Sequence, residues 1–367
     1  MNKKFIIYGI GDGIKSQPYL NKLHSILKVS GDVSFYHWRR KSKFNNNPNT
    51  DKYVDKTIFY CGKNNSRTIF LFYPIWMVIV FFHALVKSKS ADIIFSSKFE
   101  SSLPIAFLSL FFKFKYVYLD RDNIAYSYRW PKWLRGILLK LESFIGKNAE
   151  MHIVPGHSRV YEHRNNIRIL ENTPSSSLMD AAIKIDASRL LKDIDGRKIV
   201  YINGWLSDIR GFETILKAST LLEMDQSITF VFAGSGNDDQ ISMIKAAKNC
   251  RYLGILSNQE SLALYYEVAC VISLFDPSIE IHQRAEPNKW YDCIFTQTPI
   301  IVNNEIEAAN WFIKNHGFFS VDFNDAKALA NVICNIDERV KLKNKVVNPN
   351  GFDYWDVKMT GYLNELT

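Results

Sequence analysis

The sequence predicts an α/β protein made of two successive domains, each built on a doubly wound parallel sheet. Three observations lead to this expectation. Short β-branched or aromatic runs alternate with helical patterns along the chain. The alternation occurs twice, and a Ser/Pro-rich segment at 173–177 with a polar stretch at 184–197 separates the two series. A length of 367 residues also exceeds what a single ordinary core accommodates.

The first series is expected to form an N-terminal domain over residues 1–178. It begins with an apolar strand at 5–10, which a glycine turn follows at 11–13. A basic, Asn-rich stretch at 39–56 is typical of a loop. Further strands are expected at 33–38, 58–60, 91–95, 116–119, 151–154 and 167–170, and helices at 20–27, 103–112, 133–146 and 158–163.

The segment 69–86 is almost entirely apolar and reaches the lower length limit of a membrane span. It leads directly into the strand at 91–95, so a buried crossover helix fits the βαβ rhythm better than a span. A helix that partly faces lipid is a third interpretation, because basic and aromatic residues mix farther along the chain. These residues are Lys113, Lys115, Arg121, Tyr126, Tyr128, Arg129, Trp130, Lys132, Trp133, Arg135 and Lys140.

The second series is expected to form a C-terminal domain over residues 179–351. Its first strand, at 198–204, ends in glycine, and a helix follows at 212–222. Further strands are expected at 228–233, 252–254, 270–274, 300–302 and 317–321, and helices at 238–248, 258–268, 305–314 and 326–336. A last helix within residues 352–367 is expected to pack back on the first domain.

The stretch 284–305 combines a charged loop, a short helix and a buried strand. Residues 286–289 are expected in the loop and 290–295 in the helix, which ends before a Thr-Pro break at 298–299. A loop that leads into a helix N-terminus beside a parallel strand is where α/β proteins bind phosphorylated ligands. This stretch is therefore a first candidate for a binding site.

The cysteines and the N-terminal residues indicate the compartment in which the protein is expected to work. The five cysteines are scattered and contain no CxxC pair, which indicates a reducing compartment and argues against a zinc site or a disulfide framework. The N-terminus has no apolar stretch that ends in a cleavage site, so no signal peptide is expected.

Charge is distributed unevenly between the two halves. Residues 1–178 hold 27 Lys and Arg against 12 Asp and Glu, a balance of +15, whereas residues 179–367 hold 19 against 25, a balance of −6. Either the first half meets an anionic partner, a nucleic acid or an anionic membrane surface, or it is simply a basic soluble domain.

Two glycine motifs follow strands. Residues 9–13 form GxGxG rather than the dinucleotide fingerprint GxGxxG, and no acidic residue ends the second strand, so NAD or FAD binding is not expected. In the second series Gly204 ends a strand, and an Arg-Gly pair at 210–211 opens a helix six residues later. Arg210 is expected beside free helix N–H groups, where its planar guanidinium can bind a phosphate.

Four motifs in order over residues 198–305 resemble those of the group 1 (family four) retaining glycosyltransferases with the GT-B fold, of the bacterial surface-polysaccharide type. They are the strand and Arg-Gly pair just described, FVFAGSG at 230–236, YLGIL at 252–256 and PNKWYD at 287–292. Weaker similarity extends over the first half through DIIF at 92–95, YLDRD at 118–122, LE at 141–142 and LENTP at 170–174. The resemblance covers essentially the whole chain and implies two Rossmann-like domains that face each other across a cleft.

The resemblance implies that the C-terminal domain holds a nucleotide-diphosphate sugar and the N-terminal domain its acceptor. Arg210 matches the family's diphosphate-binding cation, and Asp292 matches the second acidic residue of its EX7E motif, which contacts the donor ribose. Asn288 and Lys289 match a loop that faces the donor sugar and phosphates. The remaining implied donor-site residues are Gly204, Trp205, Gly234, Gly254, Ile255, Leu256, Arg284 and Glu286.

The sequence departs from the family pattern within the donor site. Arg284 stands where the first acidic residue of EX7E belongs, and Glu286 is nearby but out of register. Trp205 replaces an arginine that binds phosphate in many members.

On the acceptor side, the family's first-domain histidine has no clear counterpart. Its position is occupied by Arg121, which Asp120 and Asp122 flank, and these three residues are the catalytic candidates. The turn Gly11, Asp12 and Gly13 is expected to form an acceptor-side loop. Three histidines on or after a strand are expected to be structural or surface residues; they are His152, His157 and His163.

The resulting prediction is a retaining, hexosyltransferase-type glycosyltransferase. It is expected to move a sugar from a UDP, GDP or dTDP donor to a lipid-linked or polysaccharide acceptor in bacterial surface glycan synthesis, such as lipopolysaccharide O-antigen, capsule or exopolysaccharide. In the family's front-face mechanism the leaving phosphate accepts the acceptor's proton, so no metal and no cofactor beyond the sugar nucleotide are expected. The expected location is cytoplasmic, peripheral at the inner face of the cell membrane.

Two alternatives stay open. A GT-B nucleotide-sugar epimerase would convert the sugar nucleotide without an acceptor. A non-catalytic partner subunit would keep the fold but lack a donor site, an interpretation that Arg284 and Trp205 favour. No nucleic-acid partner is expected, because the basic half contains no matching module.

Overall fold

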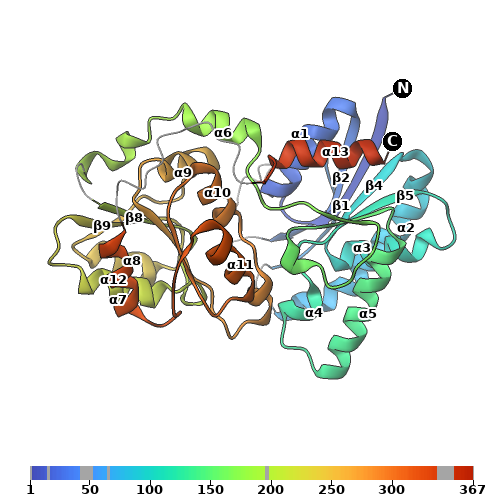
Figure 1. Ribbon diagram of the computed structural model, residues 1–367. Coiled ribbons are helices and arrows are strands. Elements are labelled where there is room, and N and C mark those ends of the chain that lie inside the picture. The colour runs from blue at the N-terminus through green and yellow to red at the C-terminus, as the bar shows by residue number, and fades with distance from the viewer. Residues whose placement is uncertain are drawn as a thin grey trace. The chain divides into compact units, whose positions relative to one another are not determined.

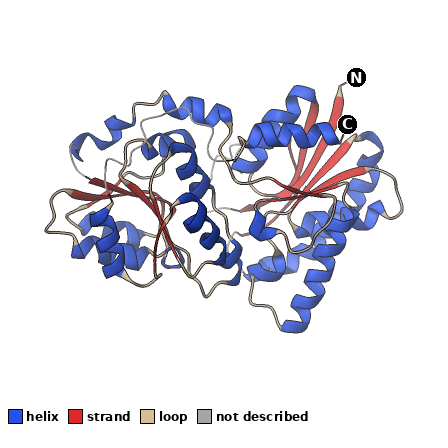
Figure 2. Cartoon of the chain, in the orientation of Figure 1, coloured by secondary structure: helices blue, strands red, loops and turns tan. Residues whose placement is uncertain are grey.

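The structure, a computed structural model, describes residues 2–14, 17–41, 53–63, 67–194, 198–336 and 351–366. The chain divides into two compact units: unit 1 comprises Met1–Glu171 and Asp356–Thr367, and unit 2 comprises Asn172–Trp355. Each unit contains one sheet with helices packed around it (Figure 2). The division falls earlier than the expected boundary after residue 178, so the segment 172–178 belongs to the second unit. Much of the Asn-rich stretch 39–56 lies outside the described residues.

The two segments expected as a connection, 173–177 and 184–197, are partly structured in the residues that are described, and the helix between them was not part of that expectation. The chain forms α6 (Ser176–Ile183) and the 3-10 helix η5 (Ala187–Ile194) here. Apolar side chains of both elements, including Met179, Ala182 and Leu191, are buried in a core of unit 2. These segments are therefore part of the second unit rather than a linker.

The sheet of unit 1 is wholly parallel and has the strand order β3-β2-β1-β4-β5-β6-β7. Its strands are β1 (Lys3–Ile10), β2 (Gly31–Lys41), β3 (Asp55–Lys63), β4 (Ile93–Ser97), β5 (Lys115–Leu119), β6 (Met151–Val154) and β7 (Ile167–Ile169). The order reverses between β1 and β4, and in doubly wound sheets ligands bind at the carboxyl ends of the strands near such a point.

Helices cover both faces of this sheet. Figure 1 shows α1 and α13 on one side and α3 and α5 on the other. The helices are α1 (Pro18–Ser30), α2 (Phe72–Lys87), α3 (Phe99–Ser109), α4 (Ile124–Ser127), α5 (Lys132–Asn148) and α13 (Trp355–Glu365), with 3-10 turns η2 (Arg67–Leu71), η3 (Ser88–Ser90) and η4 (His157–Arg159). The short helix expected at 158–163 is wrong, because only the turn η4 forms there.

The helices α2, α3 and α5 belong to one layer. Their inward side chains share a core with alternate residues of the central strands, among them Tyr8, Trp38 and Tyr118. The apolar segment 69–86 lies between β3 and β4 as predicted, forming η2 and α2. By length and composition alone, Ile69–Ser90 is apolar enough to cross a membrane, and 28% of its most apolar window is buried.

The sheet of unit 2 is also parallel, in the order β10-β9-β8-β11-β12-β13. The strands are β8 (Lys198–Trp205), β9 (Ile228–Ser235), β10 (Cys250–Tyr252), β11 (Cys270–Ser273), β12 (Ile300–Asn303) and β13 (Phe319–Val321). Side chains of β8 alternate between two cores: Ile199 and Tyr201 enter one, and Val200 and Ile202 enter the other. Both faces are thus buried, as the apolar runs of these strands predict.

The helices of unit 2 follow the predicted rhythm. They are α6, α7 (Phe212–Leu221), α8 (Asp238–Ala246), α9 (Asn258–Tyr265), α10 (Asn288–Thr296), α11 (Glu307–His316) and α12 (Ala326–Asn335), with 3-10 turns η6 (Asp208–Arg210) and η7 (Glu280–Arg284). Several expected bounds were wrong: α11 begins at Glu307 rather than at 305, α9 ends at Tyr265 rather than at 268, and α10 begins at Asn288 rather than at 290. Pro287 takes the N-cap position of α10 in extended conformation. Asn288 and Lys289 therefore belong to the first turn of a helix and not to the preceding loop.

Candidate functional site

Three predicted glycines come together at the carboxyl ends of β8, β9 and β10. Gly204 and Gly234 are register partners, and the N–H of Gly234 donates to the carbonyl of Gly254 at 2.8 Å. A Cβ on Gly234 would lie 1.9 Å from the carbonyl oxygen of Gly204, and its φ of +129° is unfavourable for any other residue. Glycine therefore lets two strand ends approach closely at the edge where parallel sheets bind ligands.

Arg210 lies in the turn between β8 and α7, at the start of the helix. Gly211 forms the N-cap of α7 with a φ of +73°, and a Cβ there would lie 2.8 Å from Leu274. The guanidinium of Arg210 stacks on the Phe275 ring, 4.0 Å from its centre. Burial lowers the pKa of Arg210 to about 10, and no salt bridge to it occurs among the described residues. The site thus holds a partly desolvated cation without a carboxylate partner.

Lys289 supplies a second cation to the same region. Its ammonium donates to the carbonyl of Asn203, at the end of β8, at 2.7 Å. Burial, followed by the charge of Arg210, lowers the pKa of Lys289 to about 8. Within the described part of the chain Lys289 has no salt bridge either. Two mutually repelling cations at a glycine-lined strand edge favour an anionic ligand, which would relieve the repulsion.

Asn203 organises the polar side of this edge, although the sequence analysis did not single it out. Its side-chain amide donates to Ser261 Oγ and to the Tyr265 hydroxyl, each at 3.0 Å. Tyr201 is linked to the same serine at 3.0 Å. The signal for Asn203 is its position directly before Gly204, near the carboxyl end of the strand, where its side chain faces α9.

The other predicted donor-site residues differ in their burial and in their hydrogen bonds to the rest of unit 2. Glu286 is buried: its carboxylate accepts from the Tyr291 hydroxyl, and its carbonyl accepts from Asn172 Nδ2 at 2.7 Å. Trp205, in contrast, leaves 57% of its surface exposed in β8. In α10, Asn288 is exposed and Asp292 is half-buried, and Arg284 is the last residue of η7. Ile255 is exposed, and Leu256 packs against the edge of a core of unit 2.

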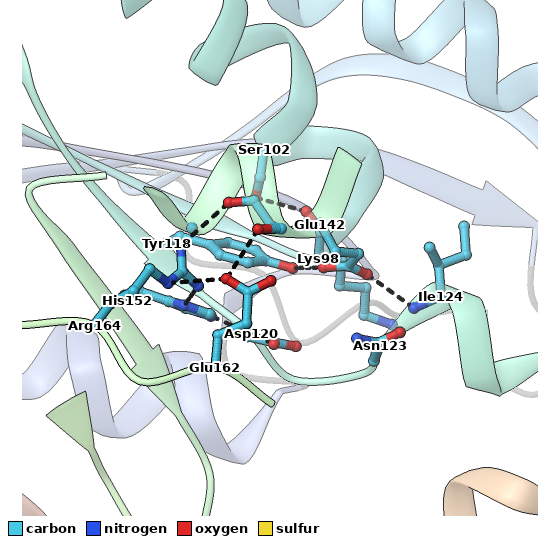
Figure 3. Close-up of polar contacts among 12 residues, drawn as sticks. Lys98, Ser102, Tyr118, Asp120, Asn123, Ile124, Glu142, His152, Glu162 and Arg164 are labelled. Carbon is cyan, nitrogen blue, oxygen red and sulfur yellow. Dashed lines mark hydrogen bonds and ion pairs between the residues drawn. The ribbon is translucent and has the colours of Figure 1, made fainter. Parts of the chain in front are cut away.

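Unit 1 contains a second candidate site, a buried polar network around Tyr118 (Figure 3). The Tyr118 hydroxyl donates to Glu142 Oε2 at 2.6 Å, and the Ile124 N–H donates to Glu142 Oε1 at 3.0 Å. The His152 ring stacks on Tyr118 with centres 4.8 Å apart. His152 Nε2 also lies 3.4 Å from Asp120 Oδ2. The network joins β5, β6 and α5 at the carboxyl edge of the sheet.

The residues of the run Asp120, Arg121 and Asp122 each have a different neighbour, and the charges of both carboxylates act on Arg121. Asp120 is buried and turns to His152. Arg121 stacks on the Tyr19 ring, 4.0 Å from its centre. Asp122 is exposed and lies 3.6 Å from the ammonium of Lys98. The Asp120–His152 pair is the part of the run that is best placed for proton chemistry.

Burial perturbs two carboxyl groups beside this pair. Burial, followed by the charge of Asp120, raises the pKa of Glu142 to about 8. Burial also raises the pKa of Glu100, at the start of α3. Lys98, directly before α3, has a φ of +68° and a ψ of +158°, a conformation that is strained for any residue but glycine.

The predicted acceptor-side turn at 11–13 lies at the same edge of the sheet, because β1 and β5 run parallel on either side of β4. The Gly11 N–H donates to the carbonyl of Trp38 at 3.0 Å, and the His37 ring hydrogen-bonds to the Gly11 carbonyl at 2.8 Å. Gly13 has a φ of +125°, which explains the glycine there.

The described residues contain no group of three or more His, Cys, Asp or Glu side chains that could hold a metal ion. Of the other two histidines considered above, His157 is exposed and lies 3.8 Å from Glu171, and His163 is exposed.

Solved structures share this fold over the whole chain. Sucrose-phosphate synthase from Thermosynechococcus elongatus is 15% identical with a TM-score of 0.66, and the match covers 100% of this chain and 99% of that one. Anabaena HepE in complex with UDP is 12% identical with a TM-score of 0.66, covering 100% of both chains. A putative UDP-N-acetylglucosamine 2-epimerase from Listeria monocytogenes is 9% identical with a TM-score of 0.68, covering 100% and 98%.

These likenesses confirm the predicted two-domain α/β fold of the GT-B class. No protein-family model matches the chain, and no curated protein matches its sequence.

Proposed function

We propose that this protein is a glycosyltransferase that uses a nucleotide-diphosphate sugar as donor and binds it in unit 2. The observation that carries the proposal is the pair Arg210 and Lys289. Both cations are partly desolvated, both have lowered pKa values, and neither forms a salt bridge among the described residues. They flank the strand end that carries Gly204. A diphosphate supplies the missing negative charge, and the positive end of the α7 dipole lies beside Arg210.

The same cations suit the chemistry of transfer. As the bond from the anomeric carbon to the diphosphate breaks, negative charge develops on the leaving phosphate, and the two cations stabilise it. In the retaining mechanism that we propose, the acceptor hydroxyl attacks from the face of the leaving group. Its oxygen bonds to the anomeric carbon while its proton passes to the departing phosphate oxygen. This scheme requires neither a metal nor a separate cofactor.

We assign the acceptor to unit 1. The buried Asp120–His152 pair and the glycine turn at 11–13 lie at the carboxyl edge of its sheet. The proposed acceptor is a lipid-linked or polysaccharide glycan in bacterial surface glycan synthesis, and the proposed transferred group is a hexose. The basic balance of residues 1–178 supports work at an anionic membrane surface on the cytoplasmic side.

Calorimetric titration of UDP, GDP and dTDP into the full chain tests the donor site. One of these nucleotides is expected to bind, and Arg210→Ala is expected to weaken it at least tenfold, because charge-assisted hydrogen bonds contribute about 1.5–3 kcal/mol each. Lys217→Ala is the matched control: it removes a cation from the exposed side of α7, where Lys217 pairs with Glu213 at 2.7 Å. Failure of all three nucleotides to bind would reject the proposal and favour a non-catalytic subunit.

A sugar-nucleotide epimerase is the second candidate, favoured by the buried Asp120, Glu142 and His152 in unit 1, which could move protons on a bound sugar. Incubating the protein with UDP-, GDP- and dTDP-sugars separates the two activities. Epimerisation without acceptor supports the second candidate. Transfer to lipid-linked glycans, with retained anomeric configuration by NMR, supports the first.

A further inference from the structure

We propose that unit 1 docks on an anionic lipid bilayer through the outer face of the layer formed by α2, α3 and α5. This docking face lies in the plane of the membrane interface and does not cross the bilayer. Docking would bring the transferase to a lipid-linked acceptor, and in this respect it rests on the proposed function. Its physical basis is independent, because it comes from side chains of unit 1, whereas Arg210 and Lys289 belong to unit 2.

The first part of the docking face is a continuous apolar stripe along η2 and α2. The exposed residues recur at intervals of three or four, as one side of a helix requires; they are Leu71, Ile75, Val78, Phe82 and Val86. Phe82 alone leaves 61% of its surface exposed. The residues of α2 include no carboxylate, and Lys87 at its end is its only charged side chain. A solvated helix would carry polar residues on this side.

The stripe continues onto the neighbouring helices. The end of α3 and the turn after it expose Phe107, Leu110, Phe111 and Phe112, with 75% of Phe111 exposed. At the start of α5, Trp133 is 69% exposed and Ile137 also faces outward. The three helices form one surface: Trp76 Nε1 donates to Ser101 Oγ at 3.1 Å, and the Phe107 and Phe144 rings lie 5.1 Å apart.

Charge indicates the kind of partner that covers this surface. Exposed lysines lie in α5 and in the turns after α2 and α3: Lys89, Lys113, Lys132, Lys140 and Lys147. The two carboxylates within these helices, Glu100 and Glu142, are both buried, and the adjoining turns expose Asp92 and Glu150. The docking face is therefore apolar, and lysines outnumber carboxylates around it. Exposed Trp and Phe combined with lysine are characteristic of the interface of an anionic membrane, where rings enter the headgroup region and ammonium groups meet phosphates.

The inner side of α2 argues against a transmembrane position. Trp76, Val80 and Ala84 are fully buried in the core of unit 1. His83 is hydrogen-bonded to the Tyr8 hydroxyl of the central strand at 2.8 Å. Extraction of α2 into a bilayer would expose the apolar side chains that it covers. Only the outer stripe is available to lipid, so the helix lies flat.

Flotation of the full chain with vesicles tests the proposal. Binding is expected to vesicles of phosphatidylcholine with phosphatidylglycerol, and to weaken when phosphatidylglycerol is omitted or salt is raised. The double variant Phe82→Glu/Phe111→Glu is expected to lose at least about tenfold in binding, because burial of even one phenylalanine accounts for that much. The matched control, Leu221→Glu/Met224→Glu, adds the same charge at exposed apolar sites of unit 2 and is expected to bind like the natural chain.

The outcomes separate the possible occupants of the docking face. Equal losses in the two double variants, or no vesicle binding by the natural chain, would overturn the proposal. So would a lipid-free dimer, seen by sedimentation velocity, that Phe82→Glu/Phe111→Glu dissociates, because a second copy would then cover the face. Urea unfolding of the same double variant shows whether unit 1 is folded. A transition like that of the natural chain with lost vesicle binding supports the proposal, while failure of the natural chain to bind a nucleotide would concern only the proposed function.

Discussion

The guanidinium of Arg210 stacks 4.0 Å from the centre of the Phe275 ring, and the His282 ring packs edge-on against the same phenylalanine with ring centres 5.2 Å apart. Aromatic stacking orients a guanidinium without neutralising it. The positive charge of Arg210 is thus held in place and remains available to a ligand. The arrangement predicts that Phe275 influences ligand affinity through Arg210.

Phe275→Leu is expected to weaken nucleotide-diphosphate binding by about threefold to thirtyfold, the equivalent of about 0.5–2 kcal/mol for a cation–π contact. Calorimetry measures the affinity. Phe312→Leu is the control, because it shortens another buried ring of unit 2 that packs against Trp290 rather than Arg210. If both variants bind the nucleotide as the natural chain does, the ring has no part in ligand recognition.

The lowered pKa of Lys289 predicts a pH dependence of donor binding. A diphosphate favours the protonated ammonium, so affinity is expected to fall as pH rises above about 8, by up to about tenfold per pH unit. Lys289→Met is expected to bind more weakly and to lack this fall. Titrations between pH 7 and 9.5 measure it. A natural chain whose affinity is constant over that range would contradict the prediction.

The raised pKa of Glu142 predicts a dependence of stability on pH with a definite sign. The pKa of Glu142 is about 8 in the folded protein, against about 4.3 for a glutamate in an unfolded chain. At pH values between these two, the folded protein keeps a proton on Glu142 that the unfolded chain releases. This contribution to stability is complete below that window and is lost as pH rises through about 8. Glu142→Gln is expected to remove the slope, because the amide resembles the protonated acid.

Urea unfolding of the natural chain and Glu142→Gln at pH 5, 7 and 9 measures this slope. Tyr118→Phe provides a comparison: loss of the hydroxyl that donates to Glu142 is expected to cost about 1–3 kcal/mol. Parallel pH profiles for the natural chain and Glu142→Gln would show that Glu142 does not titrate in this window.

Glycine substitutions are expected to have opposite effects at two positions. Gly234→Ala is expected to destabilise unit 2 by several kcal/mol, because its Cβ would overlap the Gly204 carbonyl at a φ of +129°. Gly136→Ala is expected to stabilise unit 1 by about 1 kcal/mol, because Gly136 lies within α5 with open space around its Cβ. Thermal unfolding measures both. If Gly234→Ala leaves the unfolding temperature unchanged, the two strand ends can separate to accommodate the added Cβ.

The fold and the donor edge were largely predictable from the sequence, because local patterns determine them. Runs such as that of β8 are apolar, β-branched and bounded by glycine, and consecutive parallel strands place their carboxyl ends at one edge. Gly204, Gly234 and Gly254 could therefore be grouped before their contacts were known. The start of α10 was misjudged because the N-cap role of Pro287 depends on backbone geometry around it.

The network around Tyr118 could not be predicted, because its members are distant in sequence. Glu142 reaches Tyr118 from 24 residues away and His152 reaches Asp120 from 32 away. Those contacts depend on the register of β5 against β6 and on how α5 packs, neither of which leaves a local signal. For the same reason, the spacing of Asp120, Arg121 and Asp122 did not reveal that Asp120 pairs with His152, Arg121 stacks on Tyr19 and Asp122 lies beside Lys98.

The position of helix α13 at the end of the chain affects the order in which the two units complete their folding. It completes unit 1 from the far end of the chain: Tyr362 donates to the Ile169 carbonyl at 2.7 Å, and Lys358 and Arg168 form ion pairs with Glu171 and Glu365. During translation all of unit 2 leaves the ribosome before α13 does. Unit 2 is contiguous and can fold as soon as it emerges. Unit 1, although synthesised first, acquires its last helix after unit 2 and is therefore the later of the two to reach its final structure.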